Sequence, residues 1–108
     1  MKKDLNEPDF IRFCETASPL EMVSELTNGN IRGLEMLALR TLANRRQLPA
    51  VVVNVLLVYF FSTFANKVYD RNDLSRMYDY WATKHVLTFA QAKEMTQNDI
   101  NVLLQRLK

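Results

Sequence analysis

Arg76, Tyr80 and Lys84 are the residues whose types and spacing most suggest contact with a ligand. Each lies four positions after the one before it, and residues at this spacing line one side of a helix. A tyrosine between two cations could stack on a nucleic-acid base while the cations hold phosphates. The simpler interpretation is a solvated helix face on which Arg76 pairs with Asp79. The sequence alone favours the solvated face, and the nucleic-acid interpretation stays open.

Further basic and aromatic residues lie close to this trio in the sequence. Lys67 and Arg71 flank the preceding loop and could extend a basic rim. His85 comes at the expected end of the helix, where it would interact well with the helix dipole. Trp81 could stack on a nucleic-acid base, but it lies on the apolar face of the predicted helix. We therefore expect Trp81 mainly in the core.

The sequence contains few residues that are suited to catalysis. A Cys14–His85 pair of nucleophile and base is conceivable, but a small buried cysteine and a helix-terminal histidine are the plainer interpretations. Asp70 and Asp73 could pair as acid and base, although helix capping explains them better. The sequence lacks the glycine-rich phosphate-binding motif of nucleotide hydrolases. It therefore predicts no enzymatic activity, no cofactor and no metal site.

The composition is that of one small helical domain. The chain has 108 residues, of which 48% are hydrophobic and 24% are charged, as in ordinary globular proteins. Two glycines and three prolines supply few turns, which favours helices over a sheet. The net charge of +2 is well below that of a dedicated nucleic-acid binder. A single cysteine fits a reducing, cytoplasmic setting.

Apolar periodicity and capping signals predict an all-α protein, a compact bundle of about five to six short helices. Residues 1–8 are expected to form a flexible linker and residues 9–108 a single domain. Ser18-Pro19-Leu20-Glu21 has the pattern of a capped helix start. Later helices are expected over about 31–46 and 73–84.

The long apolar run over 51–61 is ambiguous between a strand and a helix. Its valines and aromatic residues favour a strand. However, the run is longer than a usual strand, Pro49 suits a helix start, and no second strand is obvious. We therefore predict a helix that is buried on most sides. A membrane-spanning helix needs about 20 apolar residues, and Asn54 interrupts this shorter run.

The last part of the chain carries an amphipathic stripe. Ile100, Leu103, Leu104 and Leu107 fall on one side of a helix. This stripe could close the core, or it could lie against a helix of a partner protein. The sequence leaves both interpretations open.

Three segments follow one another in an order that is typical of a known domain. Ser18-Pro19-Leu20-Glu21-Met22 comes first, and Leu48-Pro49 with the valine- and leucine-rich run up to Tyr59 comes second. The third segment holds Trp81-Ala82, Lys84, Val86, Thr88 and Ala92. Together they resemble the C-terminal homology domain shared by the DnaD and DnaB primosome proteins of Gram-positive bacteria. The apolar second segment is most similar to the DnaB branch, which comprises replication initiation and membrane attachment proteins that act as helicase co-loaders.

The resemblance covers residues from about Phe10 to Met95. The family motif is usually written Tyr-x-x-x-Ile-x-x-x-Trp. Trp81 matches its last position, Met77 stands in place of Ile, and Asp73 stands in place of Tyr. The exchange of Ile for Met is conservative, whereas the exchange of Tyr for Asp is a real departure from the family pattern.

The resemblance implies a compact all-α domain of a protein that acts in initiation and restart of DNA replication and helps to load the replicative helicase. It also implies binding to DNA, single-stranded DNA included, assembly of the parent protein into homo-oligomers, and contacts with other primosome proteins such as the helicase loader and DnaD. Membrane association would be peripheral or indirect. The residues expected to contact DNA are Lys67, Arg71, Arg76, Tyr80, Trp81, Lys84 and His85. The alternative is a protein–protein adaptor that docks on the helicase, its loader or a second copy without touching DNA.

Overall fold

The computed structural model describes residues 3–108, and within this range it contains seven helices and no strand. The all-α prediction is confirmed, with slightly more helices than the five to six expected. The helices are α1 (Pro8–Thr16), α2 (Pro19–Leu26), α3 (Gly33–Arg40), α4 (Ala50–Phe64), α5 (Arg71–Thr83), α6 (Phe89–Met95) and α7 (Ile100–Leu107).

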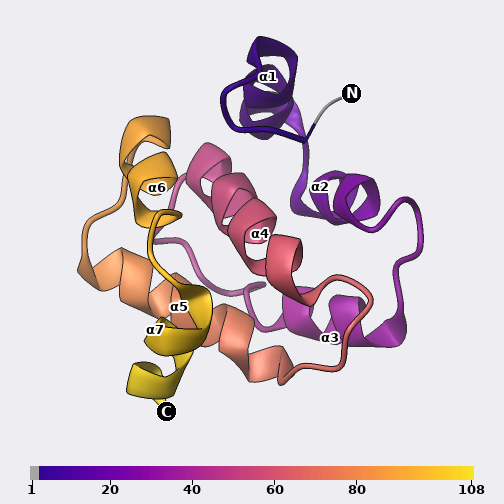
Figure 1. The fold of residues 1–108 in the computed structure, drawn as a ribbon, viewed down its shortest axis with the longest axis vertical. Helices are drawn as coiled ribbons and strands as arrows, with labels where there is room; N and C mark the ends of the chain where they lie inside the picture. Colours follow the sequence, from indigo (N-terminus) through magenta and orange to yellow (C-terminus); the bar gives the residue numbers. More distant parts are fainter. Residues whose placement is uncertain (1–2) are drawn as a thin grey trace.

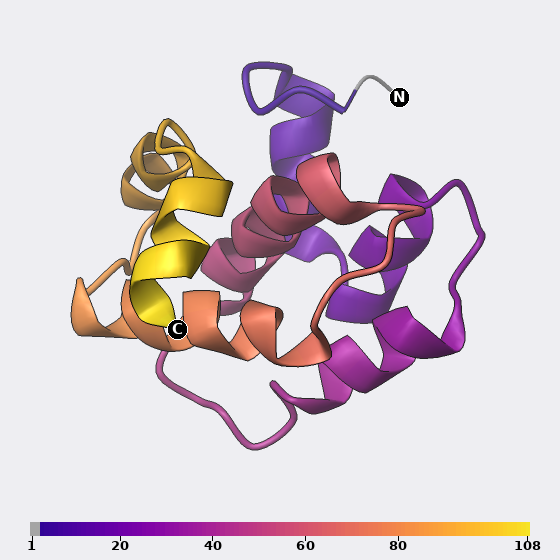
Figure 2. The same ribbon diagram turned by 60° about the horizontal axis from the view of Figure 1, so that its bottom comes forward.

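The apolar run forms α4, which lies in the middle of the molecule with other helices around it (Figures 1 and 2). Nine of its 15 residues are buried, and it packs against α1, α2, α5, α6 and α7. The predicted helix is confirmed and runs a turn further than expected. A helix that is apolar on all sides must be buried, and here the burial comes from its neighbours. Within residues 3–108 no helix is long and apolar enough to cross a membrane.

Side-chain caps begin several of the surrounding helices. Ser18 and Glu21 form the predicted capping box at α2, and Thr88 and Gln91 form a second one at α6. Asp70 caps α5 by accepting a hydrogen bond from the backbone of Asn72. Because each cap satisfies backbone groups that have no partner within the helix, these short helices start at defined positions.

The helix α3 is shorter than the predicted span of 31–46. It ends at Arg40 and continues as turns through residue 44. The backbone amides of Thr41, Leu42 and Ala43 bond to carbonyls only three residues earlier. The Thr41 hydroxyl also donates to the Ala38 carbonyl, which offers the backbone an alternative to the helical pattern. This competition explains the early end.

The described part of the first segment, residues 3–8, lies against the helices. Leu5 packs on the core, and the Asn6 side chain accepts a hydrogen bond from Lys93 of α6. Met1 and Lys2 of the predicted linker lie outside the described residues. Pro8 is already the first residue of α1.

The C-terminal helix α7 closes the core. Ile100, Leu103 and Leu104 are buried, and α7 packs against α5 and α4. The core interpretation of this stripe is confirmed. The idea that its apolar face docks on a partner is wrong, because that face is already covered.

Asn54 is the one polar residue among the buried positions of α4. Its side-chain amide donates to the backbone carbonyls of Cys14 and Ala17, at 2.9 and 2.8 Å. These carbonyls lie at the C-terminal end of α1, where helical partners are missing. Asn54 therefore acts as a side-chain cap that attaches α1 to the central helix.

Replacing Asn54 with leucine should destabilise the fold and loosen α1 in particular. The change removes both N–H donors of the side-chain amide and leaves the buried carbonyls of Cys14 and Ala17 without these bonds. We expect the free energy of unfolding to fall by about 2–4 kcal/mol. Denaturant unfolding measures the loss, and hydrogen exchange should show it concentrated in residues 8–17. Ser62→Ala, at an exposed position of the same helix, serves as the control. Unchanged exchange in α1 would contradict this role for Asn54.

Candidate nucleic-acid interface

The predicted DNA-contacting residues lie on α5 and on the loop before it. Arg71 is the first residue of the helix and Lys84 is its C-cap. A helix of 13 residues is about 20 Å long, so these two cations mark its opposite ends. Lys67, Arg71, Lys84 and His85 are exposed. The structure therefore distributes the basic groups along one helix and does not cluster them.

Arg76 lies between the two ends, but it is engaged by acidic neighbours. Its guanidinium lies 2.7 Å from Asp73 and 3.1 Å from Asp70. The backbone amide of Asn72 and the Arg76 guanidinium together hold the pKa of Asp70 below its ordinary value. A guanidinium between two carboxylates offers little net positive charge to a phosphate.

The predicted pair between Arg76 and Asp79 is wrong. Asp79 instead receives two hydrogen bonds from Arg45, at 2.8 and 3.0 Å. Arg45 comes from the turns after α3, so this ion pair joins two segments that are distant in the sequence. The pairing is possible because α3 packs against α5.

Tyr80 and Lys84 lie together as the helical spacing predicted. The Lys84 ammonium nitrogen is 5.6 Å from the centre of the Tyr80 ring, within range of a cation–π interaction. Tyr80 is partly buried and packs on the core. Part of the Tyr80 side chain therefore remains open to solvent beside a cation.

Trp81 has no exposed surface. Its ring packs against Tyr59 of α4, with ring centres 6.0 Å apart. A base cannot stack on this ring in the folded protein, so the core interpretation is confirmed and its place among the DNA-contacting residues is corrected. The indole nitrogen is buried without a hydrogen-bond partner, which is a local cost of this packing.

His85 ends α5 in a left-handed conformation, with φ of 55°. The amide of His85 bonds to the Ala82 carbonyl, and the amide of Val86 bonds to the Trp81 carbonyl. This pair of bonds is the Schellman motif, in which glycine is the usual residue at the left-handed position. The helix end is therefore well formed, although a histidine adopts a conformation that most side chains avoid.

Replacing His85 with glycine should stabilise the protein by about 1 kcal/mol, because glycine adopts the left-handed conformation without steric cost. Chemical denaturation of the variant and the wild type measures the difference. A loss of stability would mean that the imidazole makes a contact that outweighs the backbone strain.

A buried ionic group anchors the loop that carries Lys67, and sequence reasoning missed it. Glu35 is fully buried and accepts two hydrogen bonds from the Arg32 side chain, each 2.8 Å long. The Tyr69 hydroxyl donates to the same carboxylate at 2.8 Å. Arg32 also donates to the Lys67 carbonyl at 2.7 Å. The capping-box spacing of Arg32 and Glu35 gave a local signal, but their contacts to residues 67 and 69 could not be read from it.

The environment of Glu35 favours its ionised form. Burial raises the pKa of this carboxyl, but the hydrogen bonds from Arg32 and Tyr69 together outweigh burial and leave the pKa below its ordinary value of 4.5. Burial and the neighbouring carboxylate raise the pKa of the Tyr69 phenol, so it remains a donor at neutral pH. The buried Glu35 carboxylate is therefore paired with the Arg32 guanidinium and also accepts a hydrogen bond from Tyr69, so its charge is compensated.

The lowered pKa of Glu35 makes the stability of the fold depend on pH. The contribution is complete above the ordinary carboxyl pKa, near 4.5, and is lost as the pH falls through the lower pKa of the folded state. Glu35→Gln should therefore cost roughly 2 kcal/mol at neutral pH. Its deficit relative to wild type should shrink progressively below that ordinary value. Thermal unfolding across acidic pH checks this, and a constant deficit at every pH would contradict it.

Cys14 is not placed for chemistry. It is fully buried, and burial raises the pKa of its thiol to about 11. A nucleophilic thiol must be ionised and reachable, whereas His85 is exposed at the end of α5. The conceivable Cys14–His85 pair thus lacks a reactive thiolate.

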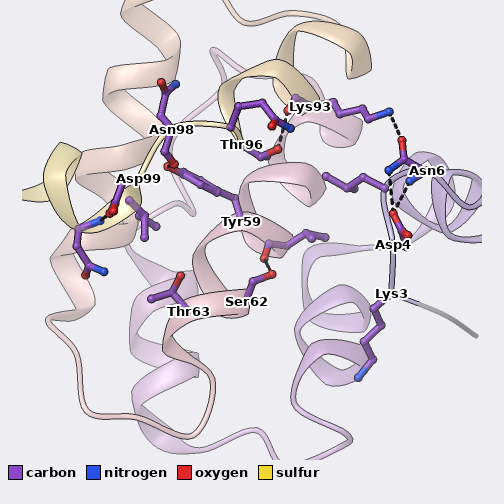
Figure 3. Close-up of a pocket in the computed structure, with 15 residues that line it drawn as sticks. Lys3, Asp4, Asn6, Tyr59, Ser62, Thr63, Lys93, Thr96, Asn98 and Asp99 are labelled. Carbon is purple, nitrogen blue, oxygen red and sulfur yellow. Dashed lines mark hydrogen bonds between the residues drawn. The ribbon is translucent and has the colours of Figure 1, made fainter.

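A polar cleft of about 820 Å³ lies between residues 3–6, the later turns of α4 and the connection from α6 to α7 (Figure 3). Its polar groups largely bond to one another. Lys93 donates to Asn6, Asp99 caps α7, and the Tyr59 hydroxyl donates to the Asn98 carbonyl. Burial raises the pKa of Tyr59 to about 12, so this phenol stays protonated. The cleft shows no concentration of charge that would select a ligand.

Comparisons with protein-family models, with curated proteins and with solved structures find no match to this chain.

Proposed function

We propose that this chain is a non-enzymatic DNA-binding and assembly domain of a primosomal protein, acting in initiation or restart of replication and in helicase loading. The observation that carries the proposal is the ordered resemblance to the DnaD/DnaB C-terminal homology domain. The segments that carry it fall on α2, α4, and α5 with the residues that follow it. A motif that includes both a capped helix start and a buried central helix is more specific than a single short pattern.

The surface around α5 supports contact with phosphates. Within residues 3–108, no ion pair neutralises Lys67, Arg71 or Lys84. Tyr80 lies beside Lys84, is only partly buried, and could stack on a base with the exposed part of its ring. With Trp81 buried and Arg76 engaged, these four residues and His85 form the proposed contact surface.

The proposed binding is weak and sensitive to salt. Few phosphates would be neutralised, and the net charge is only +2. Affinity for single strands falls with about the 0.7 power of salt concentration per phosphate contacted. A domain of this kind would gain affinity through several copies or through other DNA-binding parts of a complex.

The alternative function is a protein–protein adaptor that works without DNA contact. The buried face of α7 cannot serve it, so a different surface is needed. One observation favours this second function: an apolar groove lined by residues of α2, α3 and the segment after α3, with arginines beside it.

Fluorescence anisotropy of labelled single- and double-stranded oligonucleotides at two salt concentrations tests the DNA proposal. We expect binding at low salt and, for single strands contacted by the three cations Lys67, Arg71 and Lys84, a decrease with roughly the second power of salt concentration. Lys84→Glu should weaken binding by about tenfold, because it replaces an attraction to phosphate with a repulsion.

Arg12→Glu is the matched control, since Arg12 is an exposed arginine on α1, a helix that packs on α4. Circular dichroism confirms that both variants fold. Equal binding by wild type and Lys84→Glu would place the contact elsewhere, and no binding at low salt would reject DNA contact by this domain.

A further inference from the structure

A second surface of the molecule is a groove with an apolar floor. It has a volume of about 500 Å³, within the range of roughly 300–1,000 Å³ that is usual for ligand sites. It is formed by the start of α2, by α3 and the turns after it, and by one side chain each from α4 and α5. In Figure 2, α3 and its connection to α4 lie along the lower edge of the molecule. The apolar lining consists of Pro19, Leu20, Met36, Leu39, Leu42, Ala43 and Val53.

The large side chains at this groove are unusually open to solvent. Leu20 is 47% exposed and Met36 is 39% exposed. Leu20 follows the capped start of α2 and Met36 lies on α3, so two separate helices present apolar surface to the same space. Apolar side chains that gather around a hollow in this way mark a binding surface more often than scattered ones do.

The rim of the groove carries positive charge. Arg40, Arg45 and Arg46 line it, and no carboxylate does. Arg45 is paired with Asp79, whereas no ion pair within residues 3–108 involves Arg40 or Arg46. Arg46 is held in place by hydrogen bonds to backbone carbonyls, which leave its charge uncompensated.

We propose that this groove binds an amphipathic helical segment of a partner protein, with apolar side chains on one face and carboxylates beside them. The apolar floor would take large side chains at helical spacing, and Arg40 and Arg46 would pair with the flanking carboxylates. A nucleic acid could satisfy the arginines, but its phosphates offer nothing to the apolar floor. The groove is separate from the proposed DNA surface, because Lys67, Arg71 and Lys84 do not line it, and the inference does not depend on DNA binding.

A designed pair of peptides tests the proposal. The first is a fluorescent helix of about 16 residues with leucines at positions i, i+3, i+4 and i+7 and glutamates on the other positions. The second carries lysine in place of each glutamate. We expect saturable binding of the acidic peptide to the full chain and much weaker binding of the basic one.

Two variants at exposed positions identify the site. Leu20→Gln should weaken binding of the acidic peptide by about tenfold through the lost apolar contact. Arg40→Glu should weaken it by a similar factor and strengthen binding of the basic peptide, since the charge at the rim is reversed. Arg12→Glu, on α1, should change neither, and circular dichroism checks that each variant folds.

Other outcomes would overturn the proposal. Absence of saturable binding, equal binding of both peptides, or binding that is unchanged in Leu20→Gln and Arg40→Glu would reject the groove as a peptide site. Loss of oligonucleotide binding in Arg40→Glu, without any peptide binding, would assign the arginines to DNA instead. Concentration-dependent self-association that disappears in Leu20→Gln, measured by sedimentation velocity, would assign the groove to a second copy. Lys84→Glu affects only the DNA proposal, so the two can fail separately.

Discussion

The burial of α4 is the constraint on which the rest of the structure depends. This helix is apolar around its whole circumference and buries nine of its 15 residues, so five other helices must pack around it. Apolar burial is the dominant favourable term in folding, and a small domain has few other places to obtain it. Apolar burial alone does not set how α1 is placed. Asn54 does so, because its two hydrogen bonds fix where the end of α1 meets the central helix. The helix α3 is different, since it packs mainly on α5 and α2 and is tied by Glu35 to the loop after α4.

Many aromatic residues of the chain lie on α4 or pack against it. Phe60, Phe61, Phe64 and Tyr69 form one aromatic cluster, and Trp81 packs on Tyr59. The aromatic residues that remain for recognition at the surface are few, and Tyr80 is partly buried even so. Both proposed surfaces therefore rely on arginine and lysine side chains, and the positive charge that each offers to a ligand depends on whether a carboxylate lies beside it. Arg76 and Lys84 illustrate the difference on one helix, because the first is held by two aspartates and the second by none.

The features that the sequence predicted correctly are local ones. The capping box at Ser18, the core position of Trp81 and the neighbourhood of Tyr80 and Lys84 each follow from spacings of three or four residues along a helix. The features that it did not predict join distant segments. The partner of Asp79 is Arg45 and not Arg76, and Glu35 receives a hydrogen bond from Tyr69. Such pairs depend on which helices pack together, which periodicity does not determine. The early end of α3 is an exception, because the bonds found there are local: the Thr41 hydroxyl and the Arg45 side chain both donate to backbone carbonyls three or four residues earlier.

The two proposed surfaces share no lining residue, and their physical basis differs. Contacts to phosphates gain free energy by releasing counterions, so added salt opposes them directly. An apolar groove gains free energy by removing surface from water, which salt does not oppose, and only its charged rim is screened. The groove also depends on the turns after α3, which leave Arg40, Arg45 and Arg46 along one edge. Had α3 continued through residue 46 as a regular helix, these arginines would point in directions about 100° apart per residue, and no such rim would form. The early end of α3 thus places three nearby basic residues along the proposed groove.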